Sequence, residues 1–421
     1  MATIVIAGND LDDWRYIMRA AFHLKTLTVA VAALSVANVA GAAGLDRSGQ
    51  DITAFLQDGT YAEVVYTYID ADVTGKDASD NQIDDIAESY DFFRYGVKAD
   101  INDTFSVGVL YDEPFGAAAD YSGSNNFIDQ NATSPRNGEA TNVEVRTENI
   151  TGIIGAKLGE NKNFQIYGGP VAQRVKTDVK LRGTAYEAAN GYTTHFSADQ
   201  DYGWLAGVAY SKPEIALKAA LTYRSEIEHN APAAEIYPFV NNLPAALGLV
   251  STRSDTIEIT TPKSVNFDFQ TGVNPTTLAT AKVRWVPWGD FAITPSLYND
   301  VSQLNPTYGP DGLSLVSYDD DQWQVELGLA KRLAPNFALS GTVGWDSGAG
   351  NPVTSLGPIE GYYSVGLGGK YDVTENWAIS AGGKYLWFGD AEGQIPSKTV
   401  VSNFEDNDGF ALGVKLSYQA K

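Results

Sequence analysis

Residues 410–418 read Phe410-Ala411-Leu412-Gly413-Val414-Lys415-Leu416-Ser417-Tyr418 and alternate large apolar residues with small or polar ones. Successive side chains of a β-strand point to opposite faces, so one face of this stretch is apolar and the other is small or polar. A continuous face of large apolar side chains suits contact with lipid. The stretch therefore predicts a strand in the wall of a membrane-embedded β-barrel.

Earlier parts of the chain repeat this alternation. The apolar faces comprise Phe337, Leu339, Val343 and Trp345 in residues 337–346, Trp323, Val325, Leu327 and Leu329 in residues 323–330, and Phe105, Val107 and Val109 in residues 105–109. Strands of a soluble β-sandwich also bury one face, so no single segment separates the two classes. Composition and the order of the elements must decide between them.

Strand patterns recur along the whole chain and predict about fourteen strands. They fall at residues 60–70, 91–101, 103–112, 143–158, 163–178, 201–211, 213–226, 254–272, 277–298, 321–332, 335–346, 361–371, 375–388 and 408–419. Short connections at residues 102–103, 159–162, 211–213, 273–276, 333–336 and 372–374 alternate with long ones. Short periplasmic turns and long extracellular loops give this rhythm in bacterial barrels. We expect an all-β, transmembrane antiparallel barrel.

One stretch interrupts this rhythm. Residues 286–290 read Val286-Pro287-Trp288-Gly289-Asp290, which resembles a turn and would make the strand number odd. Single-chain bacterial barrels have even strand numbers. We therefore predict one long strand over residues 277–298 with a kink at Pro287 and Gly289, since proline and glycine mark bulges in strands. Such a kink would open a path through the wall.

The composition supports a membrane barrel. The 421 residues include 23 tyrosines and 8 tryptophans but no cysteine. Tyrosine and tryptophan favour the membrane interface, and the absence of cysteine fits passage through an oxidising compartment. The formal charge of −23 disfavours nucleic acid as a partner.

Acidic residues concentrate between the strand patterns, as in residues 70–91 and 319–321. The simpler explanation is a solvated loop surface. The alternatives are divalent cations that bridge the loops to lipopolysaccharide, or a calcium site within a loop. Outer-membrane lipid and lipopolysaccharide are therefore expected neighbours of the chain.

Residues 18–42 resemble a targeting sequence, whereas residues 1–17 do not. Residues 18–42 combine basic residues, an uncharged apolar stretch and a small-x-small site, which predicts a signal peptide cleaved after Ala42. Residues 1–17 carry Asp10, Asp12 and Asp13 where a signal peptide should be basic, so we predict that translation starts at Met18. An exported barrel is expected in the outer membrane of a Gram-negative bacterium.

Several stretches resemble one known family, the FadL/TodX transporters of long-chain fatty acids and other hydrophobic compounds. The resembling residues are Ala43-Gly44-Leu45 with Ser48-Gly49, Thr261-Pro262-Lys263-Ser264-Val265, Val283-Arg284-Trp285-Val286-Pro287-Trp288 with Phe291, Trp323 with Leu327-Gly328, Pro335-Asn336-Phe337-Ala338-Leu339 with Gly341, and Tyr362-Tyr363-Ser364-Val365-Gly366-Leu367-Gly368. The resemblance covers most of residues 43–419 and is stronger after about residue 254.

The resemblance implies a fourteen-stranded barrel over residues 60–421, with an N-terminal hatch of residues 43–59 folded inside it. It further implies passive uptake of long-chain fatty acids or hydrocarbons, with release past the hatch or sideways into the membrane. No cofactor is implied. The barrel assembly machinery is the implied partner for insertion. The hatch departs from the family pattern, because few residues precede the first strand and because no Asn-Pro-Ala motif occurs near it.

The long apolar loop of residues 227–253 is the candidate capture site. Its candidate binding residues are Tyr237, Phe239, Leu243, Leu247 and Val250. The last four recur at helical spacing, so a short amphipathic helix would present one apolar face outside the barrel. Exposed apolar patches commonly bind ligands. The alternatives are packing against neighbouring loops and binding of a partner protein.

The hatch supplies a second set of candidate binding residues, Arg47, Ile52, Phe55 and Leu56. The three apolar residues would contact an acyl chain in the lumen or pack against the wall. Arg47 would pair with a substrate carboxylate, because a guanidinium forms strong charge-assisted hydrogen bonds. Its alternative is an ion pair with a wall acid such as Glu63 or Glu326.

Catalysis and metal binding find little support in the sequence. His23 falls in the signal peptide, and His195 and His229 fall in predicted loops without a serine or cysteine motif nearby. A hydrolase needs a nucleophile and a base held together. No His/Cys cluster has metal-ligand spacing. We expect no catalytic residues and no metal site.

The main alternative function is a general or structural porin without specificity for hydrophobic compounds. A general porin should have a wide, charged, water-filled lumen. The inward positions of the later strands are instead rich in small residues, with scattered Lys370, Lys384 and Lys415. This pattern favours a narrower, plugged lumen.

Overall fold

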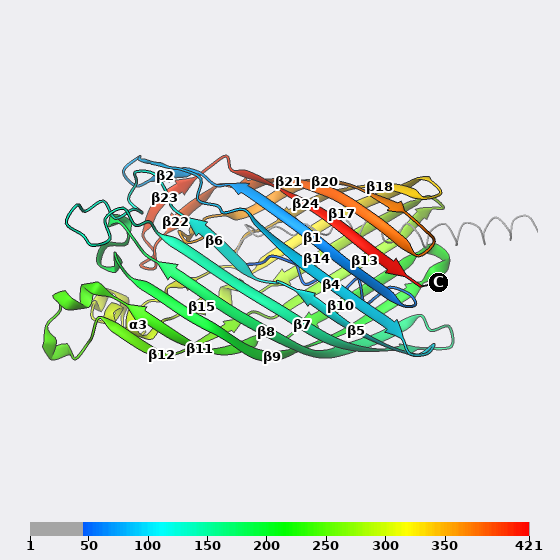
Figure 1. Ribbon diagram of the computed structural model, residues 1–421, viewed down its shortest axis with the longest axis horizontal. Helices are drawn as coiled ribbons and strands as arrows, with labels where there is room; N and C mark the ends of the chain where they lie inside the picture. The colour runs from blue at the N-terminus through cyan, green and yellow to red at the C-terminus, as the bar shows by residue number, and fades with distance from the viewer. Residues whose placement is uncertain (1–44, 421) are drawn as a thin grey trace, which may run out of the picture.

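The computed structural model describes residues 45–420, which form a closed antiparallel β-barrel (Figure 1). The first wall strand pairs with the last one, from Tyr61 with Gln419 to Asp72 with Asp408. The wall sheet contains seventeen strand segments, and three pairs of segments each continue one interrupted strand. The described chain therefore has the predicted fourteen wall strands.

The wall strands follow one another in chain order around the barrel. They are β1 (Tyr61–Asp72), β4 (Tyr90–Asp100), β5 (Phe105–Asp112) continued by β6 (Gly116–Asp120), β7 (Asn142–Leu158), β8 (Phe164–Lys180), β9 (Thr193–Lys212), β10 (Leu217–Arg224) continued by β11 (Ile227–Ile236), β12 (Thr252–Thr261) continued by β13 (Ser264–Asn274), β14 (Thr277–Val286), β17 (Gln322–Ala334), β18 (Phe337–Asp346), β20 (Glu360–Asp372), β21 (Trp377–Gly389) and β24 (Asp408–Gln419).

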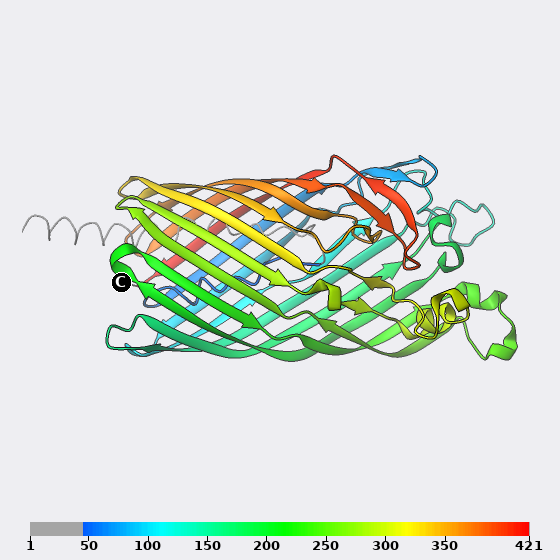
Figure 2. The ribbon, with the colours of Figure 1, turned by 180° about the vertical axis from the view of Figure 1, so that it is seen from behind.

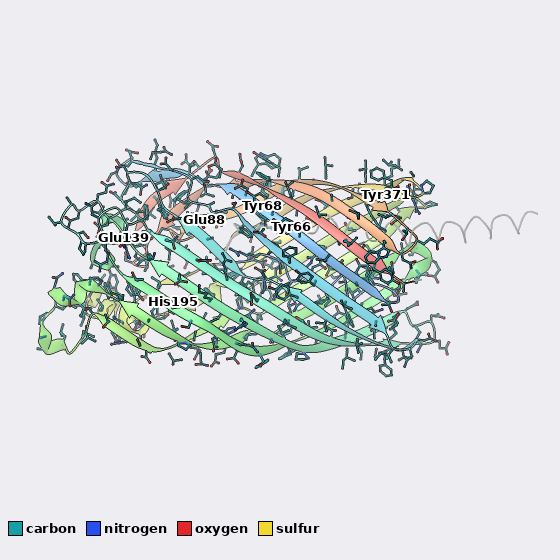
Figure 3. All side chains as sticks on the ribbon, in the orientation of Figure 1. Tyr66, Tyr68, Glu88, Glu139, His195 and Tyr371 are labelled. Carbon is teal, nitrogen blue, oxygen red and sulfur yellow. The ribbon has the colours of Figure 1, made fainter. Side chains whose placement is uncertain are left out.

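The predicted inward and outward faces are confirmed by side-chain exposure. Leu412 and Leu339 are about half exposed on the outer face, whereas Lys415 and Lys370 are buried inside. A shift of one residue would place the lysines in lipid, so this alternation fixes the register. The aromatic side chains Tyr66 and Tyr371 also project from the wall (Figure 3).

The two ends of the barrel differ as predicted. The C-terminus and the short turns lie at one end, at the right of Figure 1. The long loops gather at the other end, where Glu88 and Glu139 lie (Figure 3). Because short turns are periplasmic in bacterial barrels, the long loops form the extracellular end.

The long loops carry structure of their own. A five-stranded sheet contains β2 (Gly75–Asp77), β3 (Gln82–Ile83), β19 (Val353–Thr354), β22 (Ala391–Gln394) and β23 (Val400–Phe404), and a two-stranded sheet contains β15 (Ala292–Ile293) and β16 (Val316–Ser317). Short helices are η2 (Thr184–Ala189), η3 (Pro213–Ile215), η4 (Pro238–Asn242), η5 (Ala245–Leu247), η6 (Trp288–Asp290), α3 (Ser296–Ser302) and η7 (Pro306–Tyr308). Figure 2 shows α3 at the loop end from behind. Between residues 45 and 420 no helix has the length and apolar content needed to cross a membrane.

The predicted long strand over residues 277–298 is wrong. Strand β14 ends at Val286, and the predicted kink residues Pro287 and Gly289 lie in the turn η6 that follows it. The indole of Trp288 is fully buried and donates a hydrogen bond from Nε1 to Gln322 Oε1 at 2.8 Å. Burial of this ring draws the chain inward and out of the wall, so residues 287–321 form a long loop.

The predicted loop over residues 227–253 is shorter than expected. Strands β11 and β12 continue the wall and leave residues 237–251 as the loop. The predicted amphipathic helix is wrong, because Pro244 separates the short turns η4 and η5. Gly248 then ends η5 with φ of 69°. Proline cannot continue the hydrogen bonds of a helix.

The two described histidines belong to the wall. His195 and His229 lie on wall strands β9 and β11, so their predicted place in loops is wrong. Polar residues interrupt the alternation of apolar and polar side chains around both histidines, so these parts of the strands do not stand out in the sequence. The predicted signal peptide, residues 18–42, and the predicted untranslated segment, residues 1–17, lie outside the described residues. The division at residues 59 and 60 stays a prediction.

Candidate functional site

The hatch, described from Leu45 to Gly59, fills the lumen and is fastened to the wall by buried ion pairs. Arg284 of β14 donates to Asp46, with Nε 2.7 Å from Oδ2. Lys282 of the same strand lies 2.9 Å from Asp51. Breaking one partner of a buried pair typically costs about 3–5 kcal/mol, because the other charge stays buried. The hatch is therefore held as a closed plug.

Arg47 does not form either ion pair that the sequence suggested. Glu63 lies 3.5 Å from Lys415, and Glu326 lies 2.5 Å from Lys384. Both acids are thus engaged by lysines of the wall. Lys415 reaches Glu63 from the adjacent strand β24, and Lys384 reaches Glu326 from β21, which does not pair with β17. The Arg47 guanidinium lies over Tyr90 instead.

The Arg47 guanidinium lies over the ring of Tyr90, 4.2 Å from its centroid. The side chain is almost completely buried. Within the described chain its Nε has no hydrogen-bond partner. A Cβ placed on Gly116 would lie 2.4 Å from the guanidinium carbon, so glycine is required for this arrangement. A cation over an aromatic face is favourable, but it leaves hydrogen-bonding capacity for an anionic ligand.

The wall is interrupted beside Arg47. Strands β4 and β5 pair only up to Tyr95 with Tyr111, so residues 90–94 of β4 have no ladder partner on that side. The segment between β5 and β6 bends onto the hatch instead. The Arg47 amide donates to the Pro114 carbonyl at 2.7 Å, and the Gly116 amide donates to the Leu45 carbonyl at 2.7 Å. We call this unpaired part of the wall the window.

The apolar hatch residues Ile52, Phe55 and Leu56 are buried against the wall. They belong to one cluster with Leu110, Ile153, Tyr167 and Leu205. The rings of Phe55 and Tyr167 are 5.8 Å apart. These residues therefore hold the hatch in place in this closed state, and a role in binding substrate stays a prediction.

The loop end carries an apolar groove with a cavity of about 320 Å³. Of the candidate loop residues, Tyr237, Phe239 and Leu243 line it, whereas Leu247 and Val250 do not. The opposite side comes from residues that the sequence did not suggest, Tyr186, Tyr298, Val301, Tyr308 and Leu313. Burial raises the pKa of the Tyr186 and Tyr237 phenols, so both stay neutral. We call this cavity the groove.

One apolar cluster joins the groove to the top of the hatch. It runs from Tyr237 and Tyr298 in the groove to Trp288, Phe115 and Leu45. The rings of Phe115 and Trp288 meet edge to face, 5.5 Å apart. The cavity beneath them has a volume of only about 10 Å³. Passage of a ligand along this cluster would therefore require side chains to move.

A second cavity, of about 460 Å³, lies at the short-turn end under the hatch. Its lining is mixed and includes Gln57, Asp58, Lys218, Asp372 and Trp377. Lys218 donates a hydrogen bond to the Leu56 carbonyl at the base of the hatch. The charged side chains Asp58, Lys218 and Asp372 at this cavity distinguish it from the groove at the other end.

A short sequence pattern marks the window, but it also occurs at a second place in the chain. Pro114-Phe115-Gly116 and Pro287-Trp288-Gly289 share the pattern proline, aromatic residue, glycine. The second was predicted to interrupt a wall strand, but the first does so. Two side chains near the window, Tyr90 and Glu113, were not identified, because only the three-dimensional pairing brings them to the hatch.

Comparison with known proteins supports the fold. No protein-family model matches the chain, and no curated protein matches it. Solved structures do match: a Pseudomonas aeruginosa FadL homologue is 14% identical, with a TM-score of 0.66 over 90% of this chain and 96% of that one. The chain has the FadL/TodX fold.

Two toluene transporters extend the likeness within the FadL/TodX fold. Pseudomonas putida TodX is 13% identical, with a TM-score of 0.59 over 86% of this chain and 90% of that one. Ralstonia pickettii TbuX is 11% identical, with a TM-score of 0.58 over 93% of this chain and 98% of that one. At such low identity the likeness concerns the fold, so binding and transport must be argued from the residues of this chain.

Proposed function

We propose that this chain is an outer-membrane transporter that takes up long-chain fatty acids or other hydrophobic compounds without an energy source. The observation that carries the proposal is the apolar groove at the extracellular end of a barrel whose lumen is plugged. A general porin needs an open, water-filled lumen, whereas the hatch here is buried and ion-paired to the wall. The named function of TodX and TbuX, toluene transport, agrees with this proposal.

The proposed route begins at the groove. A hydrophobic molecule displaces water from Tyr237, Phe239 and Leu243, which the hydrophobic effect favours. It then follows the apolar cluster through Phe115 and Trp288 to the hatch. Side-chain movements at these two rings admit it one segment at a time.

The window is the proposed exit. It lies beside the hatch, and its backbone groups at Pro114 and Gly116 bond to the hatch rather than to β4. Arg47 would hold the carboxylate of a fatty acid at this point, because its Nε is unpaired. Lateral release keeps the acyl chain away from the charged side chains Asp58, Lys218 and Asp372 at the cavity under the hatch.

The test is growth on oleate as the sole carbon source, in a Gram-negative host that lacks its own fatty-acid porin and expresses this chain. The groove variant Phe239→Asp with Leu243→Asp is compared with a matched control, Leu247→Asp with Val250→Asp, from the same loop but outside the groove. We expect growth with the wild type and the control and loss of growth with the groove variant. A heat-modifiable outer-membrane band verifies folding in each case.

Two outcomes would contradict the proposal. No growth on oleate, octane or toluene with a folded barrel would reject uptake of all three compounds, whereas growth on a hydrocarbon alone would reassign the substrate. A large and steady single-channel conductance of the wild type would support the alternative, a general porin.

A further inference from the structure

A cluster of three ionisable side chains lies in the wall, away from the groove and the window. Asp199 and Asp201 belong to β9 and His229 to β11, and their ligand atoms all lie within 4.8 Å of one another. We propose that these residues bind one zinc ion, or a similar first-row divalent cation, that links β9 to β11. We call them the zinc cluster.

The buried imidazole of His229 is oriented as a metal ligand. Its Nε2 lies 3.0 Å from Gln173 Oε1, which also accepts a hydrogen bond from the Thr261 hydroxyl at 2.5 Å. The Nε2 proton therefore goes to this oxygen, and Nδ1 keeps its lone pair. Metal-bound histidines usually donate their other N–H to an oxygen in this way.

The atoms that face each other in the cluster lack other partners. Within residues 45–420, neither His229 Nδ1 nor Asp199 Oδ2 has a hydrogen-bond partner, although both are buried atoms. Their separation is 3.6 Å, which is too long for a hydrogen bond. Two ligands at about 2.1 Å from a tetrahedral zinc ion lie about 3.4 Å apart. The observed separation thus fits a shared ion better than direct contact.

The ligand types select the metal. One imidazole nitrogen with two carboxylates suits zinc, and the set leaves one tetrahedral position for water. Calcium and magnesium favour sites made of oxygen atoms alone. We therefore assign the site to zinc rather than to the alkaline-earth cations of the membrane surface.

The position of the cluster gives the ion a structural role. Strand β9 pairs with β10 as far as Leu205 with Arg224. Its pairing with β11, which continues β10, begins only at Phe196 with Ala233. The zinc cluster lies between these points. A bound ion would cross-link the two strands where the ladder is interrupted and would keep the wall closed there.

The test uses the full chain, purified in detergent and dialysed against a chelator, with ZnCl₂ or CaCl₂ as the only added ligand. Calorimetric titration compares wild type, His229→Asn, Asp201→Asn and a matched control, His195→Asn. His195 is also on β9 but lies 2.5 Å from Asp178, outside the zinc cluster. The band shift on heating verifies that each variant folds. If His229→Asn does not fold, the zinc binding of Asp201→Asn tests the proposal in its place.

We expect one zinc ion per wild-type and His195→Asn chain and loss of this binding in His229→Asn and Asp201→Asn. Gln173→Leu should weaken binding about 10–100-fold through the orientation of the imidazole. Zinc should raise the temperature of the band shift only in chains that bind it. Absence of stoichiometric zinc binding to the wild type would overturn the proposal, as would binding retained in both variants or calcium binding of equal strength.

Discussion

Arg284 and Asp46 form a bidentate ion pair between the barrel wall and the hatch. The Arg284 Nε lies 2.7 Å from Asp46 Oδ2, and Nη2 lies 2.9 Å from Oδ1. Both side chains are nearly inaccessible to solvent. This pair joins β14 to the hatch at Asp46, so it ties the plug to the wall at that residue.

Arg284→Ala should loosen the hatch. The substitution leaves the Asp46 carboxylate buried without its main partner, which typically costs about 3–5 kcal/mol. We expect a rise in ion conductance across planar bilayers, because water and ions would enter beside the hatch. The control Arg146→Ala removes a pair with Glu144 that is exposed on both sides, and such pairs contribute about 0–1 kcal/mol. A closed Arg284→Ala channel would show that the apolar hatch residues alone hold the plug.

Gly116→Ala should impair uptake through Arg47. A Cβ at this position would lie 2.4 Å from the guanidinium carbon and would force the side chain off the ring of Tyr90. We expect initial rates of radiolabelled oleate uptake to fall roughly tenfold, which corresponds to about 1.4 kcal/mol. Gly152→Ala, whose nearest neighbouring atom is 4.0 Å away, serves as the control. Equal uptake by both variants would argue against a role for Arg47 at the window.

The barrel followed from the sequence because its physical signal is local. Alternation along each strand sets the face that meets lipid, so Leu412 and Lys415 were assigned correctly without any tertiary information. Turn lengths then ordered the strands. The same reasoning wrongly predicts a continuous strand through Trp288. The burial of this residue among the loops depends on distant partners such as Gln322.

The candidate site was predictable only in part. Tyr237, Phe239 and Leu243 were found because an apolar loop is unusual. Helical spacing predicts Val250 in the same site, but Pro244 prevents a continuous helix, and Val250 lies outside the groove. The window required knowledge of which strands fail to pair, and the zinc cluster joins His229 to Asp199 and Asp201, which precede it by 28 positions or more. Single-sequence spacing carries no information on such contacts.

Val414→Arg should destabilise the barrel in lipid. Val414 lies midway along β24, and its side chain is half exposed on the outer face. An arginine at the bilayer midplane of a barrel costs about 2–4 kcal/mol, against about 0–1 kcal/mol near the interface. Leu333→Arg, beside the short turn after β17, is the interfacial control. Reversible unfolding from vesicles in guanidinium measures both, and equal losses would contradict the assigned membrane depth.

Acid should loosen the extracellular loops through Asp77. This β2 carboxylate accepts backbone hydrogen bonds from Ser79 and Asn126, the latter at 2.8 Å, and so joins two loops. Burial alone would raise the pKa of Asp77, but hydrogen bonds from Asn81, Asn126 and Ser79 lower it below the ordinary value. Because the folded state favours the charged form, this stabilisation is complete above about pH 4 and is lost as the pH falls through the lowered pKa.

Hydrogen exchange of residues 121–131, expressed as protection relative to intrinsic rates, measures this effect between pH 6 and pH 3. Wild-type protection should stay constant down to about pH 4 and fall below it. Asp77→Asn should show low protection at every pH, because the amide offers one acceptor oxygen where the carboxylate offers two. Asp80→Asn changes an exposed carboxylate of the same loop and should behave as the wild type. A fall of equal size in Asp77→Asn would assign the acid sensitivity to another group of the loop cap.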